Sequence, residues 1–229
     1  MPALNQSNFD FTKLVFTEAK ANTSNGGRYA TIGYGSEKQQ VSFQLGMFPH
    51  EPLFTKFGAD WCNQHDHSAG QQIKIDLTDN ARQFLKTLEQ CTLEAAEHHT
   101  VSWFKKKLTA DKIASLYHPL VKDGGEHGDR AHLKVYEDGS YATEVYTVTI
   151  KDGKRSGAVR GTLADVTSGS WVVPVVKVKG GAWFQNGTFG TCLWAAQLLV
   201  IKDEGASAGQ LSVDLGEVEM AEGNEDMSD

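Results

Sequence analysis

Residues 171–202 read WVVPVVKVKGGAWFQNGTFGTCLWAAQLLVIK and contain the longest strand signal in the chain. Two apolar runs, 171–179 and 189–201, flank a glycine-rich aromatic region. Asn186-Gly187 between them is typical of a two-residue hairpin turn, because both positions tolerate a positive φ. The stretch therefore predicts two strands joined by a tight turn, at the centre of a β-rich fold.

Two features modify this central stretch. Pro174 cannot donate a ladder hydrogen bond, so it favours an edge or bulged position for the first strand. Gly180-Gly181 predicts a turn before a short segment that ends at the Asn-Gly pair. We expect Trp194, within the second apolar run, to be buried in the core.

Shorter strand signals occur on the N-terminal side of this stretch. Alternation and β-branched or aromatic composition predict strands over 11–20, 28–34, 40–48, 71–77, 131–137 and 143–150. Short turns between the first three favour an antiparallel meander. Asp138-Gly139 predicts a hairpin between the last two.

A helical pair interrupts these strands. Apolar residues recur at three- and four-residue spacing over 78–99, and Thr78 is a suitable N-cap. Thr109 is expected to cap a second helix over 110–117, which Pro119 ends. The chain is therefore expected to be mainly β (α+β), an OB-fold-like antiparallel barrel with an inserted helical pair. A jelly roll is the alternative architecture.

Charge divides the chain into two parts. Of 29 Asp and Glu residues, nine follow Lys202, and no Lys or Arg does. Residues 1–202 therefore carry 20 acids against 22 bases. We predict a folded domain over 1–202 and a disordered acidic tail over 203–229, and such asymmetry is typical of nucleic-acid binding or of a tail with its own partner.

Composition also bears on the compartment. Three cysteines are too few and odd in number for a disulfide framework, which fits a reducing environment. The N-terminus shows no secretory signal pattern, and no run of 18 apolar residues occurs. We expect an intracellular, non-secreted protein with no membrane partner.

Catalytic and metal-binding patterns are weak. Cys62, His65 and His67 have zinc-type ligand chemistry, but no compact partner pair supplies a fourth ligand. The chain lacks G-x-S-x-G and a phosphate-binding G-x-x-x-x-G-K-[ST] loop. We therefore predict a non-enzymatic protein without a cofactor, and zinc at these three residues is the alternative.

Aromatic residues beside basic ones favour binding of single-stranded nucleic acid, where bases stack on rings and phosphates meet cations. Trp103 and Phe104 have an alternative role as core anchors beside solvated lysines. The candidate contacts are Arg28, Tyr29, Tyr34, Lys56, Phe57, Trp61, Trp103, Phe104, Lys105, Lys106, Lys107, Lys177, Lys179, Trp183 and Phe184.

The order of these motifs resembles a known family. PLFTKFG at 52–58, WFKK at 103–106, Tyr117-x-Pro119 and GGAWFQNGTFGTCLWAAQLLV at 180–200 look like the single-stranded DNA-binding proteins of large eukaryotic DNA viruses. They are more distantly similar to those of short-tailed phages. The resemblance implies an OB-fold, an acidic C-terminal tail and a role in replication, recombination or repair. Phage relatives tend to end in an aromatic residue, whereas this chain ends Met227-Ser228-Asp229.

These observations predict a sequence-nonspecific single-stranded DNA-binding protein. RNA is a variant of this prediction, since stacking does not distinguish sugars, and a homo-oligomer is compatible with it. We expect the tail to bind replication proteins and to compete with DNA for the groove, so that truncation near Asp203 raises affinity at low salt. A structural or virion β-barrel or jelly-roll protein without nucleic-acid binding is the rival prediction. If the protein is viral, we expect it in the host nucleus or cytoplasm.

Overall fold

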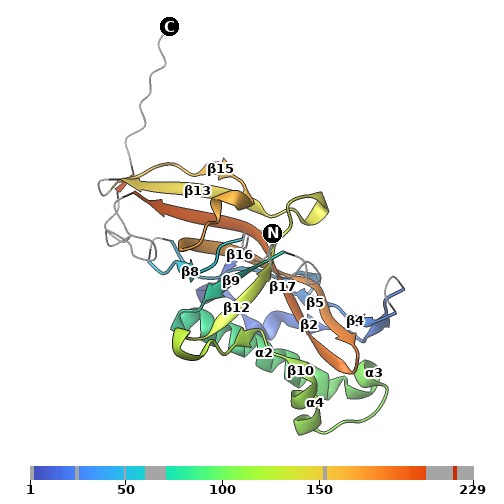
Figure 1. Ribbon diagram of the computed structural model, residues 1–229. Coiled ribbons are helices and arrows are strands. Elements are labelled where there is room, and N and C mark those ends of the chain that lie inside the picture. Colours follow the sequence, from blue (N-terminus) through green and yellow to red (C-terminus); the bar gives the residue numbers. More distant parts are fainter. Residues whose placement is uncertain are drawn as a thin grey trace.

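The computed structural model describes residues 3–23, 26–48, 50–59, 71–151, 154–204 and 219–220. Figure 1 shows a long, twisted pair of strands running through the molecule, with helices gathered along one side. Within the described ranges, no helix combines the length and apolar character that crossing a membrane requires.

Five strands close into a barrel: β8 (Leu53–Thr55), β9 (Gln72–Asp76), β12 (Arg130–Lys134), β16 (Ser170–Gln185) and β17 (Thr188–Asp203). Antiparallel pairs join β8 to β9, β9 to β12, β17 to β16 and β16 to β8. The parallel pairing of β12 with β17 closes the ring. A five-stranded Greek-key barrel, antiparallel except for this one pair, is the OB-fold architecture, which confirms the predicted fold class.

The longest pair, β16 and β17, extends beyond the barrel at both ends. Their tip is the predicted turn, since Asn186 and Gly187 have φ angles of 51° and 78°. Gly180-Gly181 does not turn the chain, which corrects our expectation. The two glycines lie inside β16, at a register shift between Val178 and Ala182. A Cβ on Gly181 would lie 2.0 Å from the Ala30 carbonyl, so only glycine permits this close approach.

Pro174 also lies in an interior strand, because β16 pairs with β17 on one side and with β8 and β7 (Ser42–Gln44) on the other. Pairing with β8 runs from Ser170 to Val172, and pairing with β7 begins at Val175. Pro174 therefore occupies the position where β16 changes partner. The predicted edge position is therefore wrong, but the predicted bulge lies nearby, because the β16–β17 register shifts between Val175 and Val176.

The expected hairpin around Asp138-Gly139 is wrong. A 3-10 helix spans Gly139–Tyr141, and β13 (Glu144–Lys151) pairs in parallel with β17 rather than with β12. β14 (Lys154–Arg155) and β15 (Val159–Gly161) pair antiparallel with β13. β18 (Glu219–Met220) then pairs in parallel with β14. Because β17 ends at Asp203, three described residues of the expected disordered tail have strand structure.

The N-terminal meander is more divided than expected. The remaining strands are β1 (Leu4–Asn5), β2 (Leu14–Phe16), β3 (Lys20–Ala21), β4 (Arg28–Ala30), β5 (Ile32–Tyr34), β6 (Gln39–Gln40), β10 (Tyr117–His118) and β11 (Val121–Lys122). β2, β5 and β6 form a separate antiparallel sheet, whereas β4 pairs with β3 and β16. The predicted strand 28–34 is thus two strands that belong to different sheets.

Three helices are inserted between β9 and β12: α2 (Asp79–His98), α3 (Thr100–Phe104) and α4 (Ala110–Leu116). The side chains of Thr78 and Thr109 cap α2 and α4 by accepting from the backbone N–H groups of Ala81 and Lys112, as predicted. The segment between them includes the short α3.

The core joins α2 to the barrel and to the N-terminal segment. The Phe84 ring of α2 lies 4.8 Å from the Phe43 ring and 5.3 Å from the Phe9 ring, centroid to centroid. Trp194 is 6% exposed, as predicted. Phe43 is fully buried, while Phe16 is half-buried against the core. This packing fixes α2 against one end of the barrel and leaves the outer faces of β9 and β12 uncovered by it.

Candidate nucleic-acid interface

The outer faces of β9 and β12 carry a row of cations. Alternate residues point inward, so Ile73, Ile75, Ala131 and Leu133 are buried in the barrel. Their neighbours Lys74, Arg130, His132 and Lys134 are half-buried on the outside. Register places His132 opposite Lys74 and Arg130 opposite Asp76, whose carboxylate accepts from the guanidinium Nε at 2.6 Å. With Lys122 of β11, these four residues define what we call the basic face.

The positive charge of the basic face lowers the pKa of His132. Burial lowers the pKa of its imidazole, and Lys74, Lys122 and Arg130 lower the pKa further. Three cations from three strands therefore act on one ring. A site where positive charges oppose the protonation of a histidine is one where a bound anion is favoured.

An open cleft of about 580 Å³ borders the basic face. Its walls come from six strands and the turn after β10. The lining residues are Gln72, His118, Pro119, Leu120, Lys122, His132, Lys134, Trp183, Gln185, Thr191, Cys192 and Leu193. The half-buried Trp183 ring lies 5.3 Å from the His118 ring. Gly190 makes room for both, since a Cβ there would lie 3.1 Å from His118 and 3.2 Å from the indole. The cleft thus combines cations with an aromatic wall.

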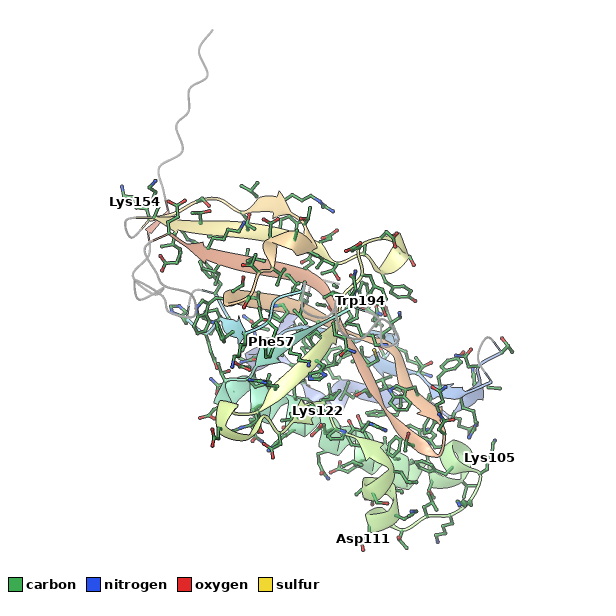
Figure 2. The ribbon with its side chains drawn as sticks, viewed as in Figure 1. Phe57, Lys105, Asp111, Lys122, Lys154 and Trp194 are labelled. Atoms are coloured by element: carbon green, nitrogen blue, oxygen red, sulfur yellow. The ribbon has the colours of Figure 1, made fainter. Side chains whose placement is uncertain are left out.

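A second aromatic ring lies at the other end of the basic face. Phe57 follows β8 and is half-buried. Lys56, Lys74 and Arg130 lie 5.7, 6.0 and 5.9 Å from its ring centroid. Figure 2 shows Phe57 and Lys122 in the middle of the molecule, between Lys154 at one end and Lys105 at the other.

A half-buried carboxylate positions one wall of the cleft. Glu89 of α2 accepts hydrogen bonds from the backbone N–H groups of Leu120 and, at 3.0 Å, Val121. Burial raises the pKa of this carboxyl, and the two N–H groups oppose that effect. The contact ties α2 to the turn between β10 and β11, which carries His118 and Lys122.

Cations continue onto β16. Burial raises the pKa of the Cys192 thiol, while Lys134 and Lys179 oppose that rise, so both ammonium groups lie near the sulfur. Lys179 donates to the Tyr136 hydroxyl at 2.6 Å, and its Nζ is 4.2 Å from the Tyr136 centroid. Lys177 lies 5.3 Å from the Trp194 ring centroid. These lysines adjoin the basic face on the same outer side of the barrel.

Several predicted contacts are placed at this surface. Lys56 and Phe57 lie at one end of the basic face, Trp183 lines the cleft, and Lys177 and Lys179 lie on the adjoining strand. Tyr29 is exposed and lies opposite Trp183 in the β4–β16 pair. β4 pairs with one edge of β16, and β17 pairs with the other edge.

Other predicted contacts are structural. Trp103 is 1% exposed and its indole N–H donates to the Thr17 carbonyl at 2.9 Å, so no base reaches its ring. Phe184 is buried with its ring stacked on Phe189. Tyr34 is buried and its hydroxyl accepts from the Asp10 N–H. These three aromatic residues complete the core instead of offering a binding surface.

Arg28 is also structural. Its guanidinium donates to the backbone carbonyls of Ser102 and Trp103, both at 2.6 Å, and to that of Ala19 at 3.0 Å. The first two carbonyls lie in the last turn of α3, where backbone acceptors lack helical partners. Arg28 therefore satisfies the end of a helix.

The remaining predicted contacts lie away from the basic face or outside the described residues. Lys105, Lys106 and Lys107 are exposed between α3 and α4, and Phe104 packs edge-on against Phe184 and Phe189. Lys105 lines a separate cleft with the tip of the β16–β17 hairpin. Trp61 and the zinc candidates Cys62, His65 and His67 lie outside the described residues. Across the residues that are described, no three metal-ligating side chains come together.

Sequence reasoning missed the centre of the site. Lys74, Lys122, Arg130, His132 and Lys134 stand alone among polar or aliphatic neighbours, not beside aromatic residues. A signal did exist, since QIKID and RAHLK both alternate apolar residues with outward polar ones. What the sequence could not show is that these two strands pair, because the helical insertion separates them.

A search of the curated proteins found no match. Among solved structures, the single-stranded DNA-binding protein of bacteriophage Enc34 in complex with single-stranded DNA is 12% identical, over 82% of this chain and 96% of that one, with a TM-score of 0.43. The same phage protein without DNA is 13% identical over 89% and 98% of the two chains, with a TM-score of 0.44. The profile of the family of unknown function DUF5871 matches residues 63–209, more than half of the sequence, and the chain belongs to that family.

Proposed function

We propose that this protein binds single-stranded DNA across the basic face, without sequence specificity and without catalysing a reaction. One observation carries the proposal. On the outside of an OB-fold barrel, Lys74, Arg130, His132 and Lys134 form a row between the rings of Phe57 and Trp183. Oligonucleotides bind OB-folds on this second-and-third-strand face and the loops beside it.

The chemistry of the site favours a single strand over a duplex. Phosphates are attracted to the lysine and arginine groups, and unpaired bases expose faces that stack on aromatic rings. Trp183 and Phe57 are half-buried, so each offers part of its ring and is held in place by its surroundings. A duplex would present phosphates only and would leave both rings unused.

The wider role is part of the same proposal. The resemblance to the single-stranded DNA-binding proteins of large eukaryotic DNA viruses supports a function in replication, recombination or repair. The Enc34 protein in complex with single-stranded DNA has a ligand of the same class. We propose that the acidic tail regulates the protein and meets replication proteins. Residues 1–202 are proposed as the binding domain and 203–229 as the tail.

The direct test is fluorescence anisotropy with labelled oligo-dT, oligo-U and duplex DNA over a salt series. We expect oligo-dT to bind more tightly than duplex DNA, and binding to weaken as salt rises because phosphate contacts release counterions. The oligo-U arm decides whether RNA is also a ligand. Absence of oligo-dT binding at about 50 mM salt, where such contacts are strong, would leave the rival structural or virion role.

Trp183 provides the matched variants. We expect Trp183→Ala to weaken oligo-dT binding by about 1–3 kcal/mol, the range for one stacked base. Trp183→Phe keeps an aromatic face, so it should retain most of the affinity while losing the tryptophan quenching that accompanies binding. Unchanged affinity in Trp183→Ala would remove this cleft from the binding site.

A further inference from the structure

We propose that the outer edge of β14 is a docking site for an extended acidic peptide, and that its occupant is the C-terminal segment of the same chain. β18 pairs in parallel with β14, with Glu219 opposite Lys154 and Met220 opposite Arg155. This placement differs from the groove competition expected from the sequence. It assigns the tail a site of its own, outside the five barrel strands, beside β14.

The β13–β14 hairpin has an edge that can accept a strand. β14 pairs antiparallel with β13 on one side, through Ile150 and Lys151, and its other side is the edge that β18 takes. An unpaired strand edge presents backbone donors and acceptors that bind another strand regardless of its side chains. Only two residues of β18 pair, so this backbone contact alone is short.

Charge supplies the selectivity that the backbone lacks. Lys151, Lys154 and Arg155 project from this hairpin, and Lys154 is exposed. The Arg155 guanidinium lies 5.3 Å from the Phe48 ring centroid, which holds it beside the hairpin. The sequence around β18 reads EVEMAE over 217–222 and contains no base. An acidic strand beside a basic edge is the favourable pairing, while a basic strand would be repelled.

The path of the chain delivers the tail to this edge. β17 ends at Asp203, which pairs with Ile150 of β13. The next residue, Glu204, forms an ion pair with Lys151 at 3.4 Å. The 14 residues from 205 to 218 can span up to about 50 Å when extended, so the chain has ample length to return to β14.

The docking site is remote from the basic face. Cys192 in the cleft and Asp203 are 11 residues apart along β17, or about 36 Å at the rise of a strand. Figure 2 shows Lys154 at the end of the molecule and Lys122 near its middle. Docking on β14 therefore keeps the acidic segment away from the cations of the cleft. This consequence, unlike the docking itself, rests on the proposed function.

Zero-length carbodiimide cross-linking of the full chain tests the docking without any nucleic acid. The reagent joins lysine ammonium groups to carboxylates in contact, and the tail is released by trypsin as one peptide because no Lys or Arg follows Lys202. The Lys151–Glu204 ion pair is the internal positive control. We expect fragment ions to place further links between Lys151 or Lys154 and Glu217, Glu219 or Glu222.

Charge reversal at the edge gives the matched comparison. Lys154→Glu should abolish the links from Lys151 to Glu217, Glu219 and Glu222, whereas Lys134→Glu on the basic face should preserve them. Links from these tail acids to Lys74, Lys122 or Lys134, or no links beyond Glu204, would overturn the proposal. Links between isotope-labelled and unlabelled chains would assign the contact to a neighbouring copy and overturn docking within one chain. Because no DNA is present, each of these outcomes leaves the proposed DNA binding untouched.

Discussion

At the scale of single residues, His132 reports on the charge of its surroundings. It lies on β12 between Lys74 of β9 and Lys122 of β11, with Arg130 on its own strand. Burial and these cations keep the pKa of its imidazole below the ordinary value, so the ring is neutral at pH 7 in the free protein. A bound phosphate would offset the same cations and raise this pKa.

This linkage predicts that His132 takes up a proton when DNA binds. Because bound phosphates would raise the pKa of His132 above its value in the free protein, affinity should increase as pH falls from about 7.5 to 5.5, through the range where histidine titrates. Oligo-dT titrations at fixed salt measure the effect. His132→Gln should flatten the profile, and His118→Gln separates the contribution of the other cleft histidine. A slope that persists unchanged in His132→Gln would exclude this ring as its source.

At the scale of elements, α2 supports the site through one carboxylate. Glu89 satisfies two backbone N–H groups of the turn that carries His118 and Lys122. Burial raises its pKa, so the charged form costs stability in the fold. For a carboxyl whose folded pKa is raised, the associated stability is present below the unfolded pKa and is lost as pH rises through the folded one.

We therefore expect two Glu89 variants to differ. Glu89→Ala leaves both N–H groups without their acceptor and should lower the free energy of unfolding by about 2–3 kcal/mol. Glu89→Gln keeps an oxygen acceptor without the charge, so its loss should be smaller and should shrink from pH 5 to pH 7. Urea unfolding at both pH values checks the pair. Equal losses in Ala and Gln variants would show that the charge, not the acceptor, holds the turn.

The elements that sequence predicts well are those set by local chemistry. α2 begins where Thr78 caps it, and the β16–β17 turn occurs at Asn186-Gly187, because a cap and a positive φ depend on neighbours in the chain. The hairpin expected at Asp138-Gly139 fails because β13 pairs with β17, some fifty residues later. Gly180-Gly181 is typical of a turn, yet the two glycines lie within β16 at a register shift, where Gly181 closely approaches the Ala30 carbonyl.

The candidate site follows the same division. The rule that seeks aromatic residues beside lysines selects Phe57 and Trp183, which lie on this surface, but it also selects Trp103, which is buried in the core. Burial depends on tertiary packing that no local pattern encodes. Lys74 and His132 face each other only because β9 and β12 pair across the helical insertion.

At the scale of the whole molecule, charge is separated in space as well as in sequence. The net charge of −7 arises from the nine acids after Lys202. The basic face lies on the barrel, and β18 lies at the far end of β17. The exposed lysines between α3 and α4 are a third group, at the opposite end from Lys154 (Figure 2). The basic face borders a cleft with the half-buried Trp183 ring, whereas in the cleft beside Lys105 the rings of Trp103 and Phe184 are buried. This difference favours the basic face as the group that binds phosphates.

Salt dependence separates the basic face from the other lysines. For single strands, each phosphate contact contributes about 0.7 to the slope of log K against log salt. Lys74→Ala combined with Lys134→Ala should therefore reduce the slope for oligo-dT by about 1.4. The control triple variant Lys105→Ala, Lys106→Ala and Lys107→Ala removes one more positive charge, yet it should leave the slope nearly unchanged because these residues lie away from the cleft. If the triple variant reduced the slope and the double variant did not, the strand would have to follow the α3–α4 connection instead of the barrel.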